Sequence, residues 1–426
     1  MVARVLVLSL LVAGAGCQKR SELYCGANPE DLANCPQTDA PVPPMMACQV
    51  DGDCTSPAKP LCSPDSHTCV GCLLTNPGYC AMQDPQKPNC DPGTLTCRGC
   101  LTNSDCTSNA CLPGTGVCAE ASTLIYVNSD SGDDAGGHDG TMTKPLKTIT
   151  KALTFVMGSR NVIRLSGAAP YNEAVVIMAK NVIILADPGT KVIAKADPAI
   201  KISGSQATIV GLELECPSSQ KNGVKCDGKS TARLVRMNIH GCPKTGLDAA
   251  DGYIELSQST VADNGDGIVI GTATFSIVND FIVHNGSTTA MHGGVDLGAI
   301  NPACHLEFNT IAHNQASATS LKGPAVTCPS LSNFPIPNNL IIANTGPATG
   351  ATLNCDASGS KTDPDPTAYQ FTQITTAPYN YHLKTGSEAI DMALTPSLIS
   401  DDVDGNFRPQ GMQKDLGADE YLAPPP

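Results

Sequence analysis

Val261-Ala262-Asp263-Asn264 is the first of four similar segments, followed by Ile282-Val283-His284-Asn285, Ile311-Ala312-His313-Asn314 and Ile341-Ile342-Ala343-Asn344. Each places a β-branched residue three positions before an asparagine, and the asparagines are 21, 29 and 30 residues apart. Repeats of this length, with a short apolar stretch and a turn in each, are typical of solenoids, in which successive coils stack. The pattern therefore predicts stacked coils rather than a conventional globule.

Aligning the coils by their inward Val or Ile brings four asparagines into one column: Asn264, Asn285, Asn314 and Asn344. Neighbouring coils would lie about 4.8 Å apart, which is the spacing of paired strands. Asparagine tolerates the left-handed turn conformation, and its amide can bond to the coils on both sides. We therefore expect a structural asparagine ladder. A glycine column follows the turn at Gly223, Gly246, Gly267 and Gly294.

Short apolar stretches separated by Gly, Asn, Asp and Pro fill the chain beyond Ser122 and predict strands of three to five residues. One helix is expected from Pro145 to Met157, because Ile149, Leu153 and Val156 would share one face behind a proline at the helix start. We expect this helix to cap the apolar end of the stack.

The amino terminus has the order of an export signal in residues 1–17: Arg4, an apolar run from Val5 to Val12, then small residues ending at Cys17. Cys17 resembles the lipidated cysteine of bacterial lipoproteins, although Gly14 stands where that family usually has Leu. The alternative is a plain secretory signal. Residues 18–47 contain prolines, lack periodicity and are interpreted as a linker. No later stretch is apolar enough to span a bilayer.

Residues 48–121 contain three units of four cysteines, each too short to bury a core of its own. Two disulfides per unit would supply the stability, with a connectivity that spacing leaves open. The pairs Cys69/Cys72 and Cys97/Cys100 also have zinc-ribbon spacing, but an export signal favours disulfides. The segments 48–54 and 100–106 resemble cysteine-rich repeats at the front of exported proteins of predatory soil bacteria.

Two segments resemble the pectin-lyase-like group of parallel β-helix proteins. The amino-terminal one includes Tyr126-Val127-Asn128 and Lys144-Pro145-Leu146-Lys147-Thr148-Ile149, and the carboxyl-terminal one includes Ala389-Ile390-Asp391 and Asp415-Leu416-Gly417-Ala418-Asp419-Glu420. The resemblance implies an all-β fold, a right-handed parallel β-helix over residues 122–388 with a folded tail over 389–426. It implies no particular reaction.

Without Cys17, 20 cysteines remain, an even number that suits pairwise oxidation after export. The segments 323–328 and 350–355 align residue for residue, so Cys328 and Cys355 should stack within disulfide reach. Cys216 is expected to pair with Cys242 or with Cys226.

Candidate chemistry lies one residue before the asparagines, where Asp263, His284 and His313 share a column. Stacked side chains of these types could hold a transition metal or perform acid–base catalysis, but polar residues beside a turn are usually only solvated. Asp263 and Asp266 also invite comparison with the carboxylates of polygalacturonases. The chain lacks that family's Asn-Thr-Asp, Asp-Asp, Gly-His-Gly and Arg-Ile-Lys segments, and His292-Gly293-Gly294 matches only part of the third.

Calcium is a further candidate, because closely spaced carboxylates on tight turns suit a hard cation. The candidate ligands are Asp130, Asp133, Asp134, Asp402 and Asp404. Neither cluster has a full twelve-residue ligand loop, and structural turns are the favoured interpretation. The chain has no Trp, and four tail aromatics are expected to cover the last coil: Tyr369, Phe371, Tyr379 and Tyr381.

The charge excludes one class of partner. With 40 acidic and 26 basic residues, a net charge of -14 repels nucleic acid and anionic lipid headgroups, and also acidic polysaccharides unless a cation bridges. The sequence favours an exported, lipid-anchored cell-envelope protein whose β-helix is a non-catalytic binding or structural module without a cofactor. Its expected partners are the membrane, through the lipid, and a polysaccharide or surface protein. The alternative is a polysaccharide lyase or glycoside hydrolase.

Overall fold

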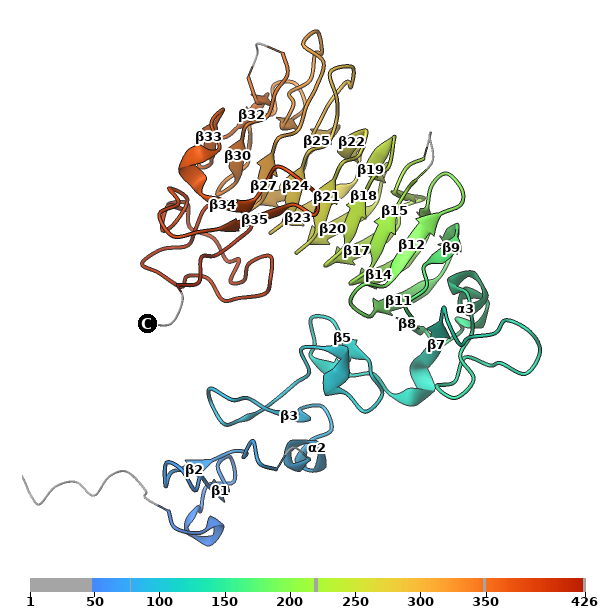
Figure 1. Ribbon diagram of the computed structural model, residues 1–426, viewed down its shortest axis with the longest axis vertical. Helices are drawn as coiled ribbons and strands as arrows, with labels where there is room; N and C mark the ends of the chain where they lie inside the picture. The colour runs from blue at the N-terminus through green and yellow to red at the C-terminus, as the bar shows by residue number, and fades with distance from the viewer. Residues whose placement is uncertain (1–47, 77, 218–220, 348–349, 424–426) are drawn as a thin grey trace, which may run out of the picture. The chain divides into compact units, whose positions relative to one another are not determined.

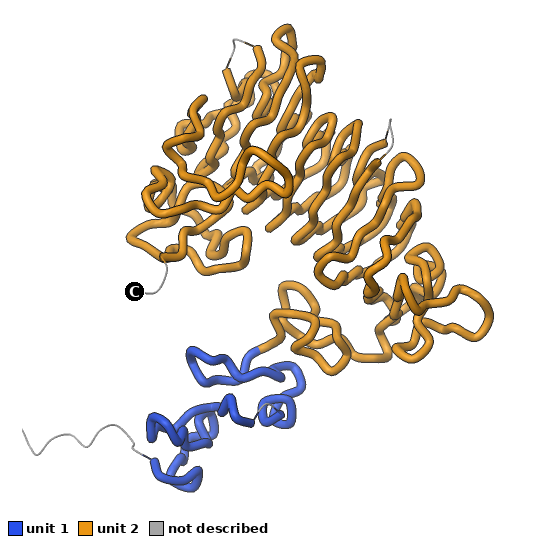
Figure 2. The backbone as a smooth tube through the Cα atoms, in the orientation of Figure 1, with its two compact units in different colours: residues 1–98 blue, residues 99–426 orange. Residues whose placement is uncertain are grey.

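The computed structural model describes residues 48–76, 78–217, 221–347 and 350–423. The predicted signal, Cys17 and the predicted linker lie outside the described residues. The chain divides into two compact units, residues 1–98 and 99–426 (Figure 2). Among the described residues no helix is both long and apolar enough to cross a membrane.

The described part of the first unit contains two of the predicted cysteine units. Its elements are η1 (Asp51–Asp53), β1 (Leu61–Cys62), β2 (Cys69–Val70), α2 (Tyr79–Gln83), β3 (Asn89–Cys90) and β4 (Cys97–Arg98). In each cysteine unit the first cysteine bonds the third and the second bonds the fourth, giving the pairs 48–62, 54–69, 72–90 and 80–97. The cysteines with zinc-ribbon spacing are therefore consumed by disulfides.

The third cysteine unit belongs to the second compact unit, with the same connectivity in the pairs 100–111 and 106–118. Its elements are η2 (Asn103–Asp105), β5 (Cys111–Leu112), β6 (Val117–Cys118) and η3 (Ala121–Thr123). Ala110 and Ala119 share a small core with Leu124, Val162 and Leu185 of the solenoid. This repeat is thereby held against the first coils by buried apolar surface.

Three parallel sheets form the solenoid, and the chain visits them in turn, which confirms the predicted parallel β-helix (Figure 1). The first sheet contains β7 (Leu124–Asn128), β8 (Val162–Ser166), β11 (Asn181–Ala186), β14 (Gln206–Val210), β17 (Thr231–Val235), β20 (Tyr253–Ser257), β23 (Thr274–Val278) and β26 (His305–Glu307). The second contains β9 (Tyr171–Glu173), β12 (Lys191–Ala194), β15 (Glu213–Glu215), β18 (Asn238–His240), β21 (Thr260–Ala262), β24 (Phe281–Val283), β27 (Thr310–Ala312), β30 (Leu340–Ile342) and β33 (Lys361–Asp363). The third contains β10 (Val175–Met178), β13 (Ile200–Ser203), β16 (Val224–Asp227), β19 (Thr245–Ala249), β22 (Asp266–Ile270), β25 (Val295–Leu297), β28 (Val326–Thr327) and β31 (Thr352–Leu353).

The asparagine column forms a continuous hydrogen-bonded ladder at the turn from the second to the third sheet. Asn264 Nδ2 donates to Asn285 Oδ1, Asn285 Nδ2 to Asn314 Oδ1, and Asn314 Nδ2 to Asn344 Oδ1, each at 3.0 Å. Each of these oxygens also accepts the backbone N–H of the preceding asparagine. Asn285 and Asn314 are fully buried, so the ladder satisfies polar groups that water cannot reach.

A second ladder, which sequence reasoning missed, occupies the turn from the first to the second sheet. Backbone N–H groups donate along the series from Ser259 to Asp280, from Asp280 to Asn309, and from Asn309 to Asn339. Its members stand two residues before the β-branched or aliphatic centre of β24, β27 and β30. The signal was therefore in the sequence, at the same period as the first ladder.

The glycine column follows from the first ladder. A Cβ on Gly246 would lie 2.8 Å from Asn264 Nδ2, and one on Gly267 would lie 2.4 Å from the Gly294 carbonyl oxygen. The expected alignment of segments 323–328 and 350–355 is wrong by one residue, because Val326 pairs with Thr352 and not with Leu353. Cys328 and Cys355 form a disulfide nonetheless, since a one-residue offset between adjacent coils leaves their Cα atoms 5.2 Å apart.

Pairwise oxidation of every cysteine is a wrong expectation. Cys216 bonds Cys242, while Cys226 and Cys304 are free and buried. Cys226 points into the core from β16, where it pairs in register with Ile202 and Ala249. In this position it acts as a small apolar core residue, and burial raises the pKa of its thiol to about 12.

The predicted cap helix exists as α3 (Ile149–Phe155), but its start was misplaced. Leu146 is still paired with Val127 as a β-bridge, so Pro145 precedes the helix by four residues. Thr148 is the N-cap, with its hydroxyl accepting from Lys151 N, and the Glu173 carboxylate accepts the N–H groups of Ile149 and Thr150. The buried side of α3 covers the core beside β7 and β8, as expected for a cap.

The carboxyl-terminal segment from Thr367 onward, called the tail from here on, covers the flank of the stack rather than its last coil. Its elements are η4 (Thr367–Tyr369), β34 (Phe371–Gln373) and β35 (Asn380–Leu383), which follow the short pair β29 (Phe334–Pro335) and β32 (Cys355–Asp356). Tyr369, Phe371 and Tyr381 form a second core with outward side chains of the second sheet, such as Phe281 and Leu340. The outward faces of β24, β27 and β30 are mainly apolar. Because an exposed apolar face is unfavourable, the aromatic residues pack on this flank and not on the end of the stack.

Asn285→Ala should lower the free energy of unfolding by roughly 2 to 4 kcal/mol, because it strands the buried N–H groups of Asn264 and removes the bond from Asn285 Nδ2 to Val261 O. Asn344→Ala is the matched control, since Asn344 ends the ladder and is partly exposed, and it should cost less. Denaturant unfolding of both variants measures the difference. Equal losses would contradict a cooperative ladder.

Asp280→Asn should stabilise the protein. Burial raises the pKa of Asp280 well above its usual value, and its Oδ2 has no partner among the described residues. An amide removes the cost of keeping a buried carboxyl neutral and adds a donor, so we expect a gain of about 1 to 3 kcal/mol at pH 7. Because the wild-type carboxyl is protonated in both states below pH ~4, the gain should shrink in acid. Melting curves from pH 4 to 8 test this, and a variant less stable than wild type at pH 7 would contradict it.

Candidate functional site

A groove with a volume of about 760 Å³ runs between the outer face of the second sheet and the tail. Its floor comes from β15, β18, β21 and β24, and one end is formed by Arg236 and Gln258 in turns between the first two sheets. The opposite wall is the tip of the β34–β35 hairpin, residues 377–380, together with His382 and Asp404. Figure 1 shows β34 and β35 beside β24 and β27. The polar lining therefore comes from two parts of the chain, one between Glu213 and Asp263 and the other between Tyr379 and Asp404.

Glu213 lies at one end of the groove and is already paired. Its Oε1 lies 2.8 Å from Lys191 Nζ and 3.0 Å from His240 Nε2. Burial opposes ionisation of Glu213, but the hydrogen bonds from Lys191 and His240 outweigh it and lower the pKa of the carboxyl. Glu213 is thus a stable anion with its charge compensated.

Asp404, on the tail side, is paired as well. His382 Nε2 lies 2.9 Å from Asp404 Oδ2, and the other ring nitrogen of His382 faces Asn380 Oδ1. Because Asn380 Oδ1 also accepts the backbone N–H of His382, both imidazole nitrogens face acceptors and both carry hydrogens. The hydrogen bond to Asp404 raises the pKa of His382, and the same bond lowers the pKa of Asp404.

The predicted column of Asp263, His284 and His313 exists, but the tail covers it. All three residues are left-handed turn residues with φ between 54° and 56°. Their side chains therefore point away from the core, toward the hairpin. Tyr379 stacks on His284 with ring centroids 3.9 Å apart, and its hydroxyl donates to Asp263 Oδ1 at 2.9 Å.

Tyr381 fixes the protonation of both histidines. The Ile374 carbonyl, 3.1 Å from His284 Nε2, can only accept, so this nitrogen carries a hydrogen. The Tyr381 hydroxyl then accepts from His284 at 2.9 Å and donates to His313 Nδ1 at 2.7 Å. Burial lowers the pKa of both imidazoles, that of His313 to about 4, with His284 adding to the effect. Tyr379 and Tyr381 thus bind Asp263, His284 and His313 and hold the tail on the stack, and this set of contacts is called the tail clasp below. Side-chain atoms of the column that could ligate a metal are engaged in these contacts.

Asp266, the other predicted catalytic residue, lies outside this groove at the start of β22. Its Oδ2 is 3.6 Å from His292 Nε2, so the structure brings together two residues that sequence comparison flagged separately. Burial raises the pKa of Asp266, opposed by the nearby His292. Asp266 Oδ1 and both His292 nitrogens are buried without hydrogen-bond partners among the described residues. Next to them, Asp296 is paired with Lys322 at 2.7 Å.

Most of the predicted calcium ligands accept hydrogen bonds from backbone N–H groups. Asp130 accepts the N–H groups of Ala168 and Ala169, and Asp134 accepts those of Lys147 and Thr148. Asp133 accepts from Ala135 N. Asp402 is fully buried and accepts the N–H groups of Asp404, Asn406 and Glu420. These contacts are those of structural turns, the interpretation that the sequence favoured.

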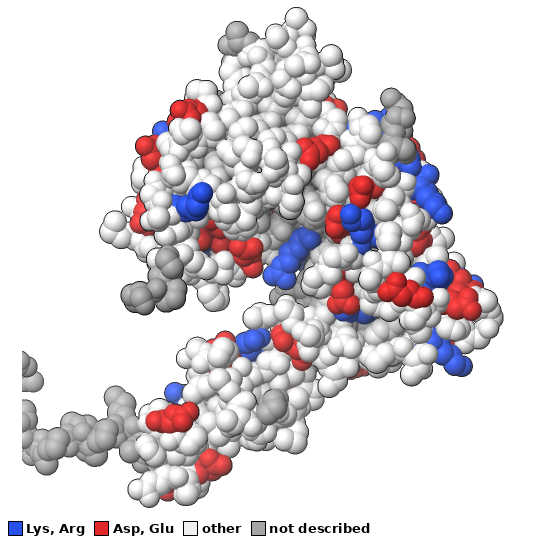
Figure 3. Space-filling model, in the orientation of Figure 1, with Lys and Arg blue, Asp and Glu red and all other residues white. Residues whose placement is uncertain are grey.

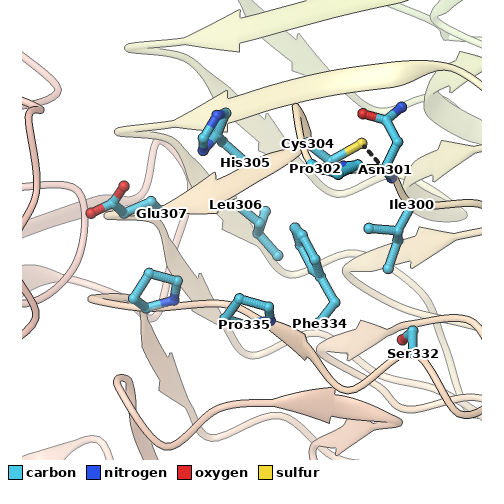
Figure 4. A pocket seen from close by; sticks show the side chains of 11 residues that line it. Ile300, Asn301, Pro302, Cys304, His305, Leu306, Glu307, Ser332, Phe334 and Pro335 are labelled. Atoms are coloured by element: carbon cyan, nitrogen blue, oxygen red, sulfur yellow. Dashed lines mark hydrogen bonds between the residues drawn. The ribbon is translucent and has the colours of Figure 1, made fainter.

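A second cavity of about 540 Å³ opens where the first sheet ends at β26 (Figure 4). Leu306 and Phe334 point into it, whereas His305 and Glu307 point away. The next coil carries Pro335 and Pro337 in place of residues that would donate to β26, so the ladder of the first sheet stops there. The lining is mainly apolar and offers no cluster of titratable groups.

Acidic and basic side chains stand close together on the visible face of the second unit rather than forming areas of one sign (Figure 3). Ion pairs between neighbouring coils account for much of this pattern: Lys191–Glu215, Lys201–Asp227, Lys225–Asp248, Arg233–Glu255 and Lys244–Asp197. Much of the charge on the coils is therefore compensated between neighbouring strands.

Comparison with known proteins adds little. No protein-family description matches the sequence, and no curated protein matches it. Among solved structures, the chain is similar to pectate lyase Pel9A, with 13% identity, a TM-score of 0.39, and coverage of 70% of this chain and 96% of the other. A likeness of this size carries no information about substrate or chemistry.

The tail clasp should weaken in acid. Because folding lowers the pKa of His313 to about 4, its contribution to stability is complete above pH 6.5 and is lost as the pH falls from 6.5 to 4. His382 has the opposite effect. Folding raises its pKa, so its contribution to stability is complete below pH 6.5 and is lost as the pH rises. We therefore compare wild type with His313→Gln, in which only the first effect is removed. In wild type, acid should lower the melting temperature and increase limited proteolysis of the tail more steeply than in the variant, and parallel profiles would contradict the clasp.

Proposed function

We propose that this chain is an exported, lipid-anchored cell-envelope protein whose β-helix binds an uncharged polysaccharide in the groove without cleaving it. The observation that carries the proposal is that each carboxylate lining the groove is engaged by a partner side chain. Glu213 is paired with Lys191 and His240, Asp263 with Tyr379, and Asp404 with His382. Cleavage of a glycosidic bond needs an acid and a base or nucleophile that are not committed elsewhere.

The lining also suits a polar, neutral ligand. Arg236 and Asn238 present exposed polar side chains, Thr260 is partly exposed, and the partly exposed Tyr379 adds aromatic surface. Pockets that combine apolar surface with a few fixed polar groups are typical of binding sites for small molecules and sugars. For an uncharged ligand, hydrogen bonds and contact with aromatic rings would provide the affinity.

Export is supported by two observations. The first 17 residues have the order of a signal and end at Cys17. Sixteen cysteines are engaged in disulfides among the described residues, which is typical of an oxidising compartment. Lipidation at Cys17 would attach the lipid on the amino-terminal side of the cysteine-rich repeats, which precede the β-helix along the chain.

A second candidate function is cleavage of a polysaccharide, and the Asp266–His292 pair favours it. A carboxyl of raised pKa beside an imidazole is the kind of pair that transfers protons in catalysis. The pair lies on the third sheet, whereas the groove lies on the second. Catalysis would therefore require a binding surface other than the groove.

The double variant Asn238→Ala, Thr260→Ala should reduce binding of neutral oligosaccharides at least tenfold, because it removes polar groups from the groove floor. Thr208→Ala, on the outer face of the first sheet, is the matched control and should bind normally. A glycan array identifies a ligand, and calorimetry measures the change. Reducing ends and unsaturated products should not accumulate. Product formation that Asp266→Asn abolishes would establish the catalytic alternative, and binding unaffected by the double variant would exclude the groove.

A further inference from the structure

Three side chains that can ligate a metal converge on the outer face of the second sheet. Glu213 and Glu215 are two residues apart on β15 and therefore point to the same side. His240 on β18 stands directly beside Glu215 in the strand register. One ligand atom from each of the three residues lies within 4.8 Å of the other two. The parallel stacking of coils thus brings His240 beside two glutamates that precede it by 25 and 27 positions.

A positive charge already occupies the centre of this cluster. Lys191 stands beside Glu213 on the neighbouring strand, and its Nζ lies 2.8 Å from Glu213 Oε1 and 3.0 Å from Glu215 Oε2. The ammonium group marks where two carboxylates hold a cation together. All four side chains remain partly exposed, between 25% and 32%. Lys191 can therefore leave on its flexible stem without disturbing the core.

We propose that Glu213, Glu215 and His240 bind a divalent transition ion such as zinc, with Lys191 as an internal competitor that fills the position when no ion is bound. Two carboxylate oxygens and one imidazole nitrogen form a mixed set of three ligands, which suits zinc and leaves a coordination position open toward solvent. Calcium prefers oxygen ligands and would gain nothing from His240.

Binding requires two rearrangements, both local. The Lys191 ammonium must move away from the carboxylates, and His240 Nε2, which faces Glu213 Oε1 at 3.0 Å, must give up any hydrogen that it shares there. The imidazole then carries its hydrogen on Nδ1, the tautomer that leaves Nε2 free to ligate. Metal binding should therefore release protons and weaken in acid.

Other mixed clusters in the described residues are more heavily engaged. In the group of His382, Asp404 and Asp419, both ring nitrogens of His382 face acceptors, and Asp419 Oδ2 accepts the buried N–H of Leu383. The column of His284 and His313 is closed by Tyr381. At Glu213, Glu215 and His240, by contrast, a side chain that reaches solvent is what the ion displaces.

Zinc titration of the full chain by calorimetry at pH 7.5 tests this proposal, with equilibrium dialysis as a second measurement. Lys191→Met should tighten zinc binding at least tenfold, because it removes the competing charge and leaves the three ligands in place. Glu215→Gln and His240→Gln should each weaken binding at least tenfold. His305→Gln is the matched control, since His305 is exposed on β26 of the first sheet, and it should bind as wild type.

The outcomes separate cleanly. Zinc binding that is as tight in His240→Gln as in wild type would place the ion elsewhere, for example at cysteines, and would overturn the proposal. So would an affinity in Lys191→Met no higher than in wild type. Circular dichroism confirms that each variant is folded. Because no polysaccharide is present, the result does not depend on whether the groove binds sugar.

Discussion

Stacking of asparagine amides at one turn determines the register on which the rest of the molecule depends. Each amide in the series from Asn264 to Asn344 bonds the next coil through its side chain and through the backbone. A buried amide that slipped by one residue would lose several hydrogen bonds at once, and a coil that slipped would turn its apolar residues outward. The glycine column is a consequence, because the ladder and the next coil occupy the space where side chains would project. In this way a polar interaction fixes the alignment, while apolar burial supplies most of the stability.

The same turn also positions the tail. Residues immediately before the ladder asparagines adopt the left-handed conformation, which directs the side chains of Asp263, His284 and His313 outward. Tyr379 and Tyr381 bind these side chains, and the hairpin that carries them becomes one wall of the groove. The position of the groove is therefore set by the coil register, because the coils supply its floor and also position the hairpin that forms its opposite wall. A substitution in the ladder should therefore change the shape of the groove by shifting the tail, although the ladder does not line the groove.

The sequence predicted what is local and periodic. The stacked coils, the ladder and the glycine column follow from spacings of 20 to 30 residues that can be read along the chain, and the cap helix follows from a helical apolar face. It could not predict the partner of the histidine column, because Tyr381 lies 68 residues beyond His313 and outside the repeat. Nor could it predict the Lys191–Glu213–Glu215–His240 cluster, since that requires the register of three coils at residues with no common motif. The predicted start of α3 was wrong for a local reason. Pro145 suits the first position of a helix, but Leu146 pairs with Val127 as a β-bridge, so the helix begins after it.

Binding and proton chemistry are separated on this fold. The groove on the second sheet has its carboxylates engaged by Lys191, His240, His382 and Tyr379, so a ligand of the proposed kind would meet fixed polar groups there. The carboxyl whose pKa burial raises beside an imidazole, Asp266, lies on the third sheet, across the turn that the asparagine ladder fills. The ladder asparagines are buried and bonded along the stack, so they hold the two surfaces at a fixed separation and give no route for a substrate between them. A catalytic β-helix needs binding groups and reacting groups on one surface, and their separation here is the strongest physical argument for a binding module.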